Sequence, residues 1–248
     1  MSGDPLYLAI DQGTHASRAV VLDARGAVVA TGSKDLGLAR PQPDRAEQDG
    51  EAMVASIYAA VQQATRKLGD RCQDIVAAGL ASQRASCACW DANGGRPLSP
   101  VFSWQDRRAH EWLRQFEPQA QEIHRKSGLF LSAHYGASKL RWALENLPEV
   151  KEALADGTLC WGPQASFLVF RLTAERSMVA DPQCAARTQL WNIHTRDWDA
   201  DLLDLFGLPH GHLPRSVPTC HRYGTLRVGE LSVPLVAVNG DQSAAVFA

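Results

Sequence analysis

The stretch YLAIDQGTHASRAVVLD, residues 7–23, contains two apolar runs of strand length that are separated by a short polar segment. A third run, AVVATG at 27–32, follows directly after the turn residues ARG. Short strands joined by tight turns that contain glycine are typical of an antiparallel meander. We therefore predict three antiparallel strands at the start of the chain, with residues 11–18 at one end of the first hairpin.

Helical and strand patterns follow along the rest of the chain. The segment 49–69 has apolar residues at helical spacing, and DIVAAGLASQ at 74–83 has the length of a buried parallel strand. Another strand with a turn is predicted at 85–95, and a strand, a turn and the opening of a helix at 233–248. Further helices are predicted at 104–116, 118–128, 137–157, 163–174 and 197–209. This order predicts an α/β fold with a mixed sheet.

The composition is that of an ordinary globular protein, with 248 residues of which 45% are hydrophobic and 21% charged. This length is sufficient for one large domain or two small ones. The net charge is −2 and the 25 lysine and arginine residues are scattered, so the basic patch that nucleic-acid binding requires is missing. No apolar run approaches the roughly 20 residues needed to cross a bilayer, so no membrane partner is expected.

The N-terminal residues MSGDPLYLAID contain no basic stretch followed by an apolar core, so no signal peptide is predicted. The six cysteines include no CxxC pair, which argues against a zinc site, and we predict buried, reduced thiols. These features together indicate a cytoplasmic location. The last predicted helix is apolar and has no stop signal, so we expect that residue 248 is not a natural terminus.

The tip of the first hairpin has residue types that bind a nucleotide phosphate. Gly13 allows backbone N–H groups to approach an anion, Thr14 offers a hydroxyl, and Arg18 offers a planar fork for phosphate oxygens. Asp11 would be repelled by phosphate, so it requires a cation between them, and Mg²⁺ is the natural candidate. A solvated polar hairpin tip explains the same residues without a ligand.

The sequence AIDQGTHASRAVVLD at 9–23 resembles the phosphate hairpin of the FGGY carbohydrate kinases, and within that family it is closest to the glycerol kinases. Five further matches follow in the order of the family, along almost the whole chain. They are SQR at 82–84, SWQDRR at 103–108, ASKLRW at 137–142, ARTQLWNIHTRDWDADLLDLFGLP at 186–209 and NGDQSAAVFA at 239–248.

This resemblance implies an RNase H-like domain of the actin/hexokinase ATPase type. It implies that residues 1–248 form the N-terminal, substrate-binding domain, the first of two in the family, with the adenosine-binding domain outside this chain. It also implies ATP and Mg²⁺ as cofactors, with Asp11 at the metal. The residues that it places at the nucleotide are Asp11, Gln12, Gly13, Thr14 and Arg18. Family members often form dimers or tetramers, although the sequence shows no interface signal for a homo-oligomer.

Phosphorylation of an alcohol requires a base that accepts the hydroxyl proton. Asp241 follows an apolar strand and begins a helix, a position that helix N-capping alone explains. The resemblance implies that Asp241 is the general base and that Gln242 contacts the substrate. The two interpretations are compatible with each other.

Arg84 and Trp104 are candidates for the substrate pocket. Arg84 follows a buried-strand pattern, so its side chain is expected at the carboxyl end of that strand, where ligands gather in open α/β sheets. An arginine can hold several hydroxyls of a polyol, and Trp104 can form an apolar wall for the carbon chain. A surface arginine and a core tryptophan explain the same residues without a substrate.

Two positions depart from the glycerol kinase pattern. Ala85 stands where those enzymes have Glu, and His134 stands where they have a Tyr that contacts glycerol. A shift of one residue would instead place Tyr135 there. The lost carboxylate removes a hydrogen-bond acceptor and enlarges the pocket, so we predict that glycerol binds poorly and that a larger polyol or ketose fits better.

We therefore predict an ATP-dependent phosphotransferase that acts on a hydroxyl of a small polyol or sugar other than glycerol. The isolated domain is expected to be inactive, because most of the adenosine pocket would lie outside it. The alternatives are a non-catalytic sugar-binding module, which includes half of a split or decayed kinase, and another actin-fold protein such as a chaperone-like ATPase or a sugar-responsive regulator. GDQ at 240–242 favours a kinase over the last of these.

Overall fold

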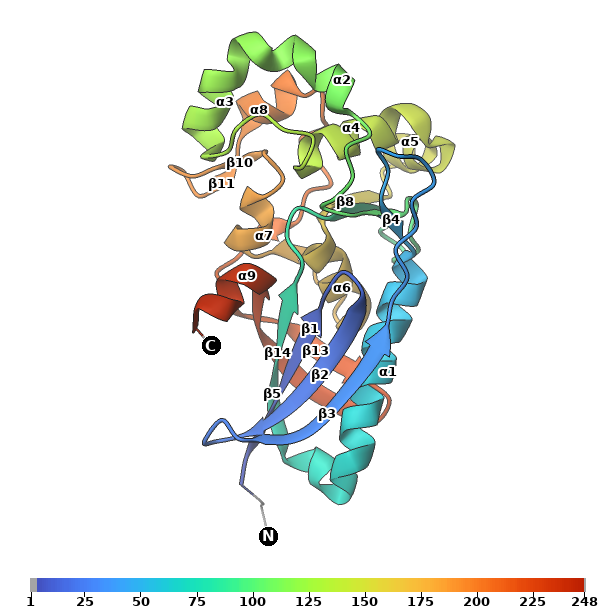
Figure 1. The fold of residues 1–248 in the computed structure, drawn as a ribbon, viewed down its shortest axis with the longest axis vertical. Coiled ribbons are helices and arrows are strands. Elements are labelled where there is room, and N and C mark those ends of the chain that lie inside the picture. The colour runs from blue at the N-terminus through green and yellow to red at the C-terminus, as the bar shows by residue number, and fades with distance from the viewer. Residues whose placement is uncertain (1–3, 248) are drawn as a thin grey trace.

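The predicted N-terminal meander is present in the computed structural model, which describes residues 4–247 (Figure 1). It consists of β1 (Leu6–Gln12), β2 (Ala16–Asp23) and β3 (Val28–Asp35). Three more strands extend it: β5 (Ile75–Ser82), β13 (Cys220–Val228) and β14 (Leu231–Gly240). The sheet has the order β13-β14-β5-β1-β2-β3, and β5 runs parallel to both β1 and β14. The other pairs are antiparallel, which confirms the mixed sheet.

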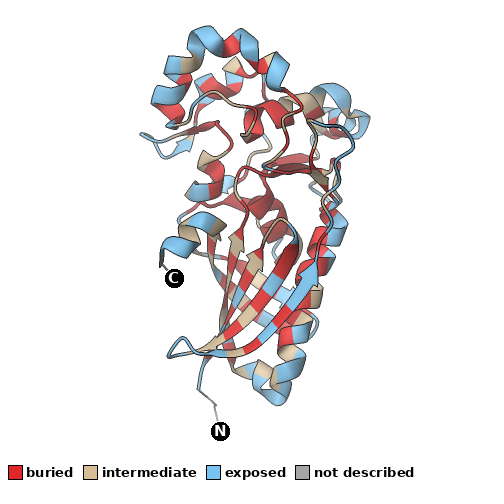
Figure 2. Ribbon diagram, in the orientation of Figure 1, coloured by how far each residue is buried: buried red, intermediate tan, exposed pale blue. Residues whose placement is uncertain are grey.

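Helices α1 (Gly50–Leu68) and α6 (Gln164–Leu172) cover one face of this sheet. The side chains of β1 alternate between buried and accessible, so Leu6, Leu8 and Ile10 point into the core beneath these helices (Figure 2). Gly32 in β3 permits a very close approach of α1, because a Cβ atom there would lie 2.0 Å from the carbonyl oxygen of Ala60.

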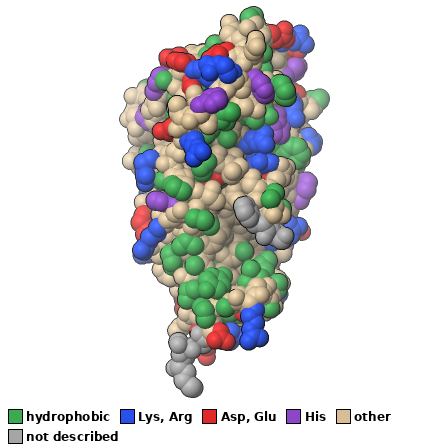
Figure 3. Space-filling view, turned by 90° about the vertical axis from the view of Figure 1, so that its left-hand side faces the viewer, with side chains coloured by type: hydrophobic (Ala, Val, Ile, Leu, Met, Phe, Trp, Pro, Cys, Tyr) green, Lys and Arg blue, Asp and Glu red, His purple; other side chains and the backbone are tan. Residues whose placement is uncertain are grey.

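The opposite face of the sheet is largely open among the described residues. It carries the exposed side chain of Tyr7, and the neighbouring Val76 and Val236 are exposed as well. Figure 3 shows hydrophobic side chains gathered over the lower half of the side of the molecule that it presents. Asp11 belongs to this face, because it lies two and four residues after Ala9 and Tyr7 on β1.

A second, mainly helical half has its own hydrophobic core, which includes Phe102, Leu140 and Trp161. Its sheet has the order β4-β7-β6-β8, formed by Glu47–Gln48, Val101–Phe102, Cys87–Asp91 and Leu159–Pro163. Its helices are α2 (His110–Leu113), α3 (Ala120–Ser127), α4 (Gly136–Asn146), α5 (Pro148–Ala155) and α8 (Ala200–Leu205). A short 3₁₀ helix at Arg114–Gln119 follows α2 in this half. Two others lie outside it, at Gly69–Asp74 after α1 and at Ala245–Phe247 at the end of the described chain.

The remaining short elements lie between the two halves and around the helical one. They are β9 (Val179–Ala180), α7 (Pro182–Ala186), β10 (Trp191–Asn192), β11 (Asp197–Trp198), β12 (Arg215–Ser216) and α9 (Asp241–Ala244). Figure 1 places α9, and with it the C-terminal end of the chain, at the junction of the two halves.

Three predicted helices are wrong in extent. The helix predicted at 197–209 is limited to Ala200–Leu205, because Asp197 and Trp198 form β11 and the Asp199 carboxylate caps the helix. The helix predicted at 104–116 begins only at His110, because the Asp106 carboxylate accepts hydrogen bonds from the Ala46 and Arg108 backbone N–H groups and holds this segment in a turn. The helix predicted at 137–157 is divided at Pro148, which cannot continue a preceding helix but suits the first turn of the next one.

The prediction of buried cysteines is confirmed for four positions and wrong for Cys220, which is exposed, while Cys72 is partly exposed. All six are free thiols. Across the described residues, every helix is too short or too polar to cross a membrane.

Candidate active site

Three parallel strands end side by side where the two halves of the molecule meet. Gln12 on β1 is aligned with Ser82 on β5, and Ser82 is aligned with Gly240 on β14. Adjacent strands lie about 4.8 Å apart, so the ends of β1 and β14 are separated by about 10 Å although they come from opposite ends of the chain. In α/β sheets the carboxyl ends of parallel strands are the usual place for a ligand.

A cavity of about 240 Å³ opens at these strand ends. Its lining combines residues of the sheet half with residues of the helical half: Thr14, Gln83, Arg84, Trp104, His134, Arg187, Asp241 and Gln242. Its volume lies below the range of about 300–1,000 Å³ that is usual for drug-sized ligands, so it suits a small polar molecule. Every predicted substrate residue lines this one cavity.

The hairpin tip joins the cavity through Thr14. The Thr14 hydroxyl donates to Gln83 Oε1 at 3.0 Å and accepts from Trp104 Nε1 at 3.1 Å. The hydroxyl hydrogen of Thr14 is therefore already donated within the protein, and the hydroxyl oxygen fixes the position of the Trp104 ring by accepting its N–H. Gly13 closes the turn by donating its N–H to the Ala16 carbonyl at 3.0 Å.

Behind the hairpin lies a network of buried glutamine side chains. Gln83 Nε2 donates to Gln48 Oε1 at 2.7 Å and to Gln164 Oε1 at 2.9 Å, and Gln164 in turn donates to Gln12. Gln48 Nε2 donates to the Thr14 carbonyl at 2.8 Å. Gln12 is fully buried, because it alternates with Asp11 and so faces the covered side of the sheet. The network therefore holds the hairpin in position from below.

Asp11 and Arg18 lie beside the cavity and do not line it. They pair across the hairpin at 3.3 Å, and both side chains are substantially exposed, so the pair contributes little to stability. Among the described residues no group of three or more His, Cys, Asp or Glu side chains is placed to hold a metal ion. A single exposed carboxylate still suits Mg²⁺, which is usually bound by one or two carboxylates together with substrate phosphates and water.

Asp241 is the first residue of α9 and follows Gly240 directly. Gly240 is the N-cap, and the Asp241 carboxylate accepts from the Gln242 N–H at 2.7 Å. The Arg84 side chain packs across Gly240, where an added Cβ would lie 2.3 Å from Arg84 Cδ. The Arg84 guanidinium donates to Gln242 Oε1 and, at 3.4 Å, to Ser243.

His134 and Trp104 form an aromatic wall, with ring centroids 6.1 Å apart and an edge-on arrangement. The structure places His134 in the cavity lining and Tyr135 beside it, outside the lining. Burial, together with the charges of Lys139, Arg107 and Arg187, lowers the pKa of His134 to about 4, so the ring is neutral at pH 7.

Ala85 is buried and does not line the cavity. Its φ of 62° lies in the left-handed region, which is unusual for a residue other than glycine. The Lys139 ammonium donates to the Ala85 carbonyl at 3.3 Å and so supports this strained backbone from inside.

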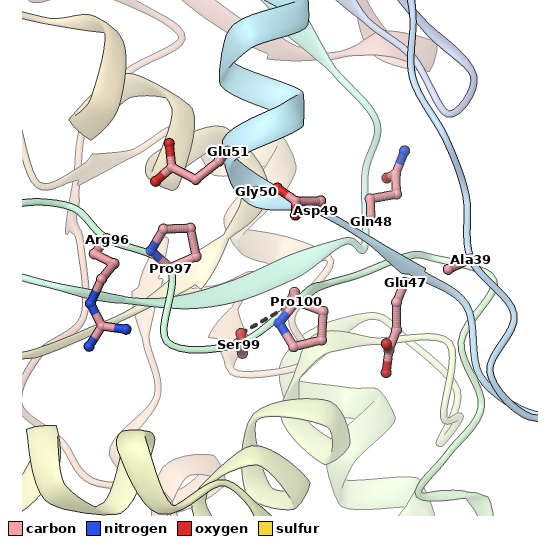
Figure 4. Close-up of a pocket in the computed structure, with 10 residues that line it drawn as sticks. All are labelled: Ala39, Glu47, Gln48, Asp49, Gly50, Glu51, Arg96, Pro97, Ser99 and Pro100. Atoms are coloured by element: carbon pink, nitrogen blue, oxygen red, sulfur yellow. Dashed lines mark hydrogen bonds between the residues drawn. The ribbon is translucent and has the colours of Figure 1, made fainter.

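A larger cavity of about 480 Å³ lies elsewhere, at the N-terminal end of α1 (Figure 4). Its charged lining residues are Glu47, Asp49, Glu51 and Arg96. All four already have partners: Glu47 binds Arg108, Asp49 caps α1, Glu51 binds Arg171, and Arg96 binds Glu149. None of the predicted site residues lines this cavity.

Sequence reasoning missed two residues of the site. Gln83 and Arg187 both lie in segments that match the family, SQR and ARTQLW, yet neither shows a recognisable chemical pattern on its own. Arg187 directly follows α7, which packs against β14, and only this packing brings its side chain to the strand ends.

Known proteins that are similar to this chain identify its family. The family model described as the FGGY family of carbohydrate kinases, N-terminal domain, matches residues 6–248. A glycerol kinase from Chromobacterium violaceum is 34% identical over 248 residues, which are 98% of this chain and 50% of that protein. A glycerol kinase from Polaromonas naphthalenivorans is 36% identical over 244 residues, 97% of this chain and 49% of that protein. The chain thus spans about half the length of these relatives.

Solved structures give the same result for the fold. Plasmodium falciparum glycerol kinase with ADP has a TM-score of 0.90 and 25% identity, covering 98% of this chain and 49% of that one. A xylulose kinase from Rhodospirillum rubrum has a TM-score of 0.86 at 21% identity, covering 97% of this chain and 51% of that one. The fold is therefore of the actin/hexokinase-like ATPase type. Because the family model matches nearly the whole length of this chain, the chain belongs to the FGGY family of carbohydrate kinases.

Proposed function

We propose that the 240 Å³ cavity binds the carbohydrate substrate of an ATP-dependent kinase, and that Asp241 accepts the proton of the hydroxyl that is phosphorylated. The observation that carries this proposal is the meeting of Asp241 with Arg84 and Trp104 in one cavity at the ends of parallel strands. Membership in a family of carbohydrate kinases supports phosphoryl transfer as the class of reaction.

In this reaction the substrate hydroxyl oxygen attacks the γ-phosphorus of ATP, its proton passes to Asp241, and the bond from the γ-phosphorus to the bridging oxygen breaks to release ADP. Arg84 donates to the other hydroxyls of the substrate, and Gln242 donates to them or accepts from them. The Trp104 ring packs against its carbon chain. Because Thr14 holds the Trp104 indole, this apolar wall is already in place before the substrate arrives.

We place the nucleotide phosphates at the hairpin tip, over Gly13 and Thr14 and within reach of Arg18. Asp11, an exposed carboxylate on the open face of the sheet, is the residue that fits the metal. Mg²⁺, when bound, neutralises charge on the phosphates. Gln12 belongs to the buried network, so we assign it the support of the hairpin rather than contact with the nucleotide.

We propose that the substrate is a polyol or sugar other than glycerol. The cavity contains no carboxylate besides Asp241, and the position of the glycerol kinase glutamate is the buried Ala85. A neutral imidazole at His134 replaces the phenol of a tyrosine. We assign carbohydrate binding to this chain and turnover to the whole protein, because the chain spans about half the length of its relatives and the adenosine pocket is expected outside it.

The test is an ADP-release assay on the whole protein, coupled to NADH oxidation, with glycerol and a series of four- to six-carbon polyols and ketoses as substrates. We expect kcat/KM for the best of the larger compounds to exceed that for glycerol. Asp241→Asn should lower kcat by about a hundredfold or more, the scale of losing a general base. Asp156→Asn, at an exposed carboxylate at the end of α5, is the matched control and should retain the parent rate.

Two results would overturn the proposal. A rate for Asp241→Asn within a few-fold of the parent would rule out Asp241 as the base. Turnover of glycerol that equals or exceeds that of every larger compound would contradict the assigned substrate.

A further inference from the structure

Arg108 is a buried cation that holds two carboxylates together behind the candidate site. Its side chain is 1% exposed and lies between the rings of Phe102 and Trp142, with Cζ 4.4 Å from each ring centroid. Its guanidinium donates to both carboxylate oxygens of Asp106, at 2.9 and 2.7 Å, and to Glu47 Oε1 at 2.6 Å. A planar guanidinium can bind two carboxylates in one fixed arrangement.

Asp106 and Arg108 remain charged in this buried cluster. Burial opposes the ionisation of Asp106, but the hydrogen bonds from Arg108 and from the Ala46 N–H outweigh it and keep the pKa of Asp106 below its usual value. Burial likewise opposes the charge of Arg108, and the hydrogen bonds to Asp106 and Glu47 outweigh it and raise the pKa of Arg108. Because a buried charge that loses its partner is costly, these groups hold one another in place.

A first path of contacts runs from Arg108 to the phosphate hairpin through the turn that contains Trp104. The Asp106 N–H donates to the Ser103 carbonyl at 3.0 Å, which closes this turn. The Trp104 indole N–H in turn donates to the Thr14 hydroxyl at 3.1 Å. The position of Asp106 therefore affects where the aromatic wall of the cavity meets the hairpin.

A second path runs from Arg108 to the hairpin through β4. Glu47 directly precedes Gln48 on this strand, and Gln48 Nε2 donates to the Thr14 carbonyl at 2.8 Å. Both paths end at Thr14, one at its hydroxyl and the other at its carbonyl. Arg108 therefore closes a ring of contacts behind the cavity that holds the hairpin at two points.

We propose that Arg108 is a positioning residue for carbohydrate binding, because it fixes the Trp104 wall and the phosphate hairpin relative to each other. This inference rests on the proposed function and adds a residue that does not line the cavity. Lysine is not equivalent at this position, since an ammonium is a point charge without the planar fork that binds both carboxylates. Without the ring of contacts, the wall would no longer be in place before the substrate arrives.

The test follows the Trp104 indole N–H by NMR in the ¹⁵N-labelled 248-residue chain. In the Arg108→Lys variant we expect this hydrogen to exchange with water about tenfold faster, because its hydrogen bond to Thr14 opens more often. The Trp198 indole N–H, which donates to the Pro214 carbonyl at 2.7 Å, is the internal control. Its exchange rate should stay within about twofold of the parent rate.

Arg171→Lys is the matched control variant. Arg171 also donates two hydrogen bonds to one carboxylate, that of Glu51, at 2.5 and 2.8 Å, and its Cζ lies 5.8 Å from the Phe167 ring centroid. None of these three residues lines the 240 Å³ cavity. The variant should therefore leave the exchange rate of the Trp104 indole within about twofold of the parent rate.

Glu47→Ala breaks the second path and is the milder of the two test variants, because the Glu47 side chain is 23% exposed and Arg108 keeps Asp106 as its partner. It should accelerate the exchange of the Trp104 indole hydrogen as Arg108→Lys does, to a smaller extent. An unchanged Trp104 rate in Glu47→Ala would overturn the inference, even where Arg108→Lys does not fold. Equal acceleration at Trp104 and Trp198 would also overturn it, because a general loss of stability explains that result.

The ADP-release assay on the whole protein separates this inference from the proposed function. Arg108→Lys should raise KM for the carbohydrate about fivefold or more with a smaller change in kcat, whereas Asp241→Asn lowers kcat. If the Trp104 signal responds as expected but the whole protein phosphorylates no carbohydrate, the role of Arg108 in holding Trp104 stands and the kinase assignment fails. If the parent is active and Arg108→Lys has the parent KM, the kinase assignment stands and the positioning role fails.

Discussion

Lys139 is fully buried, and its ammonium group connects three loops at the candidate site. It donates to the carbonyl groups of Ser103 and His134, both at 2.8 Å, and to that of Ala85 at 3.3 Å. Each of these residues is in the cavity lining or next to a residue that is. Lys139 is thus a positioning residue, because it fixes the backbone from which Arg84 and Trp104 extend into the cavity.

This role predicts a dependence of carbohydrate binding on pH. Burial lowers the pKa of Lys139 from 10.5 to about 8, so its proton is lost as the pH rises through 8. The ammonium has three donors for three carbonyls and the neutral amine has two, so binding should weaken by a few-fold between pH 7 and pH 9. Isothermal titration calorimetry with the carbohydrate at half-unit pH intervals measures this pH dependence of Kd.

The Lys139→Met variant should bind carbohydrate weakly at pH 7, and its Kd should not change further as the pH rises through 8. Lys151→Met, at an exposed position of α5, should behave as the parent. A parent Kd that is constant from pH 7 to 9, together with a Lys139→Met affinity within twofold of the parent, would contradict the positioning role.

At the scale of elements, α1 approaches β3 very closely at Gly32. A methyl group at Gly32 would meet backbone atoms of Ala60 and Ala64 at 2.0 and 2.9 Å, and backbone cannot move aside as a flexible side chain can. Gly32→Ala should therefore lower the free energy of unfolding by about 3 kcal/mol or more, the upper end of the cost of overpacking. Urea denaturation followed by circular dichroism measures the change.

Gly37→Ala is the matched control, because no atom lies within 4 Å of the added methyl group and the site is exposed. It should alter the free energy of unfolding by less than about 0.5 kcal/mol. Equal stabilities of the two variants would show that α1 does not approach β3 as closely as described.

Elements with strong hydrophobic periodicity could be predicted from the sequence, and others could not. The strands β1, β2, β3 and β5 contain apolar runs of strand length, and the helix α1 has apolar residues at helical spacing. β13 (CHRYGTLRV) was missed because it is largely polar and forms by pairing with β14, a contact that local sequence does not encode. The sequence predicts a helix at residues 104–109. The Asp106 carboxylate instead accepts hydrogen bonds from backbone N–H groups, which opposes a helix there.

At the scale of the whole molecule, residue chemistry and family resemblance were enough to bring Thr14, Arg84, Trp104, His134 and Asp241 to one cavity. Asp11 was expected with them, but strand alternation places it on the open face of the sheet beside the cavity. The buried glutamine network and the place of Arg187 in the cavity were beyond prediction, because these residues are scattered through the sequence and meet only when the two halves of the molecule pack together.

The central claim is that the two ends of the polypeptide contact one bound carbohydrate. An NMR titration of the ¹⁵N-labelled 248-residue chain with xylitol, repeated with xylonate, tests it most directly, using the Thr14 and Gln242 amide signals and the Trp104 indole signal. We predict that all three signals shift along curves with one shared Kd for whichever compound binds. Shifts confined to Thr14 or to Gln242, or different Kd values for the two, would show that no common site exists.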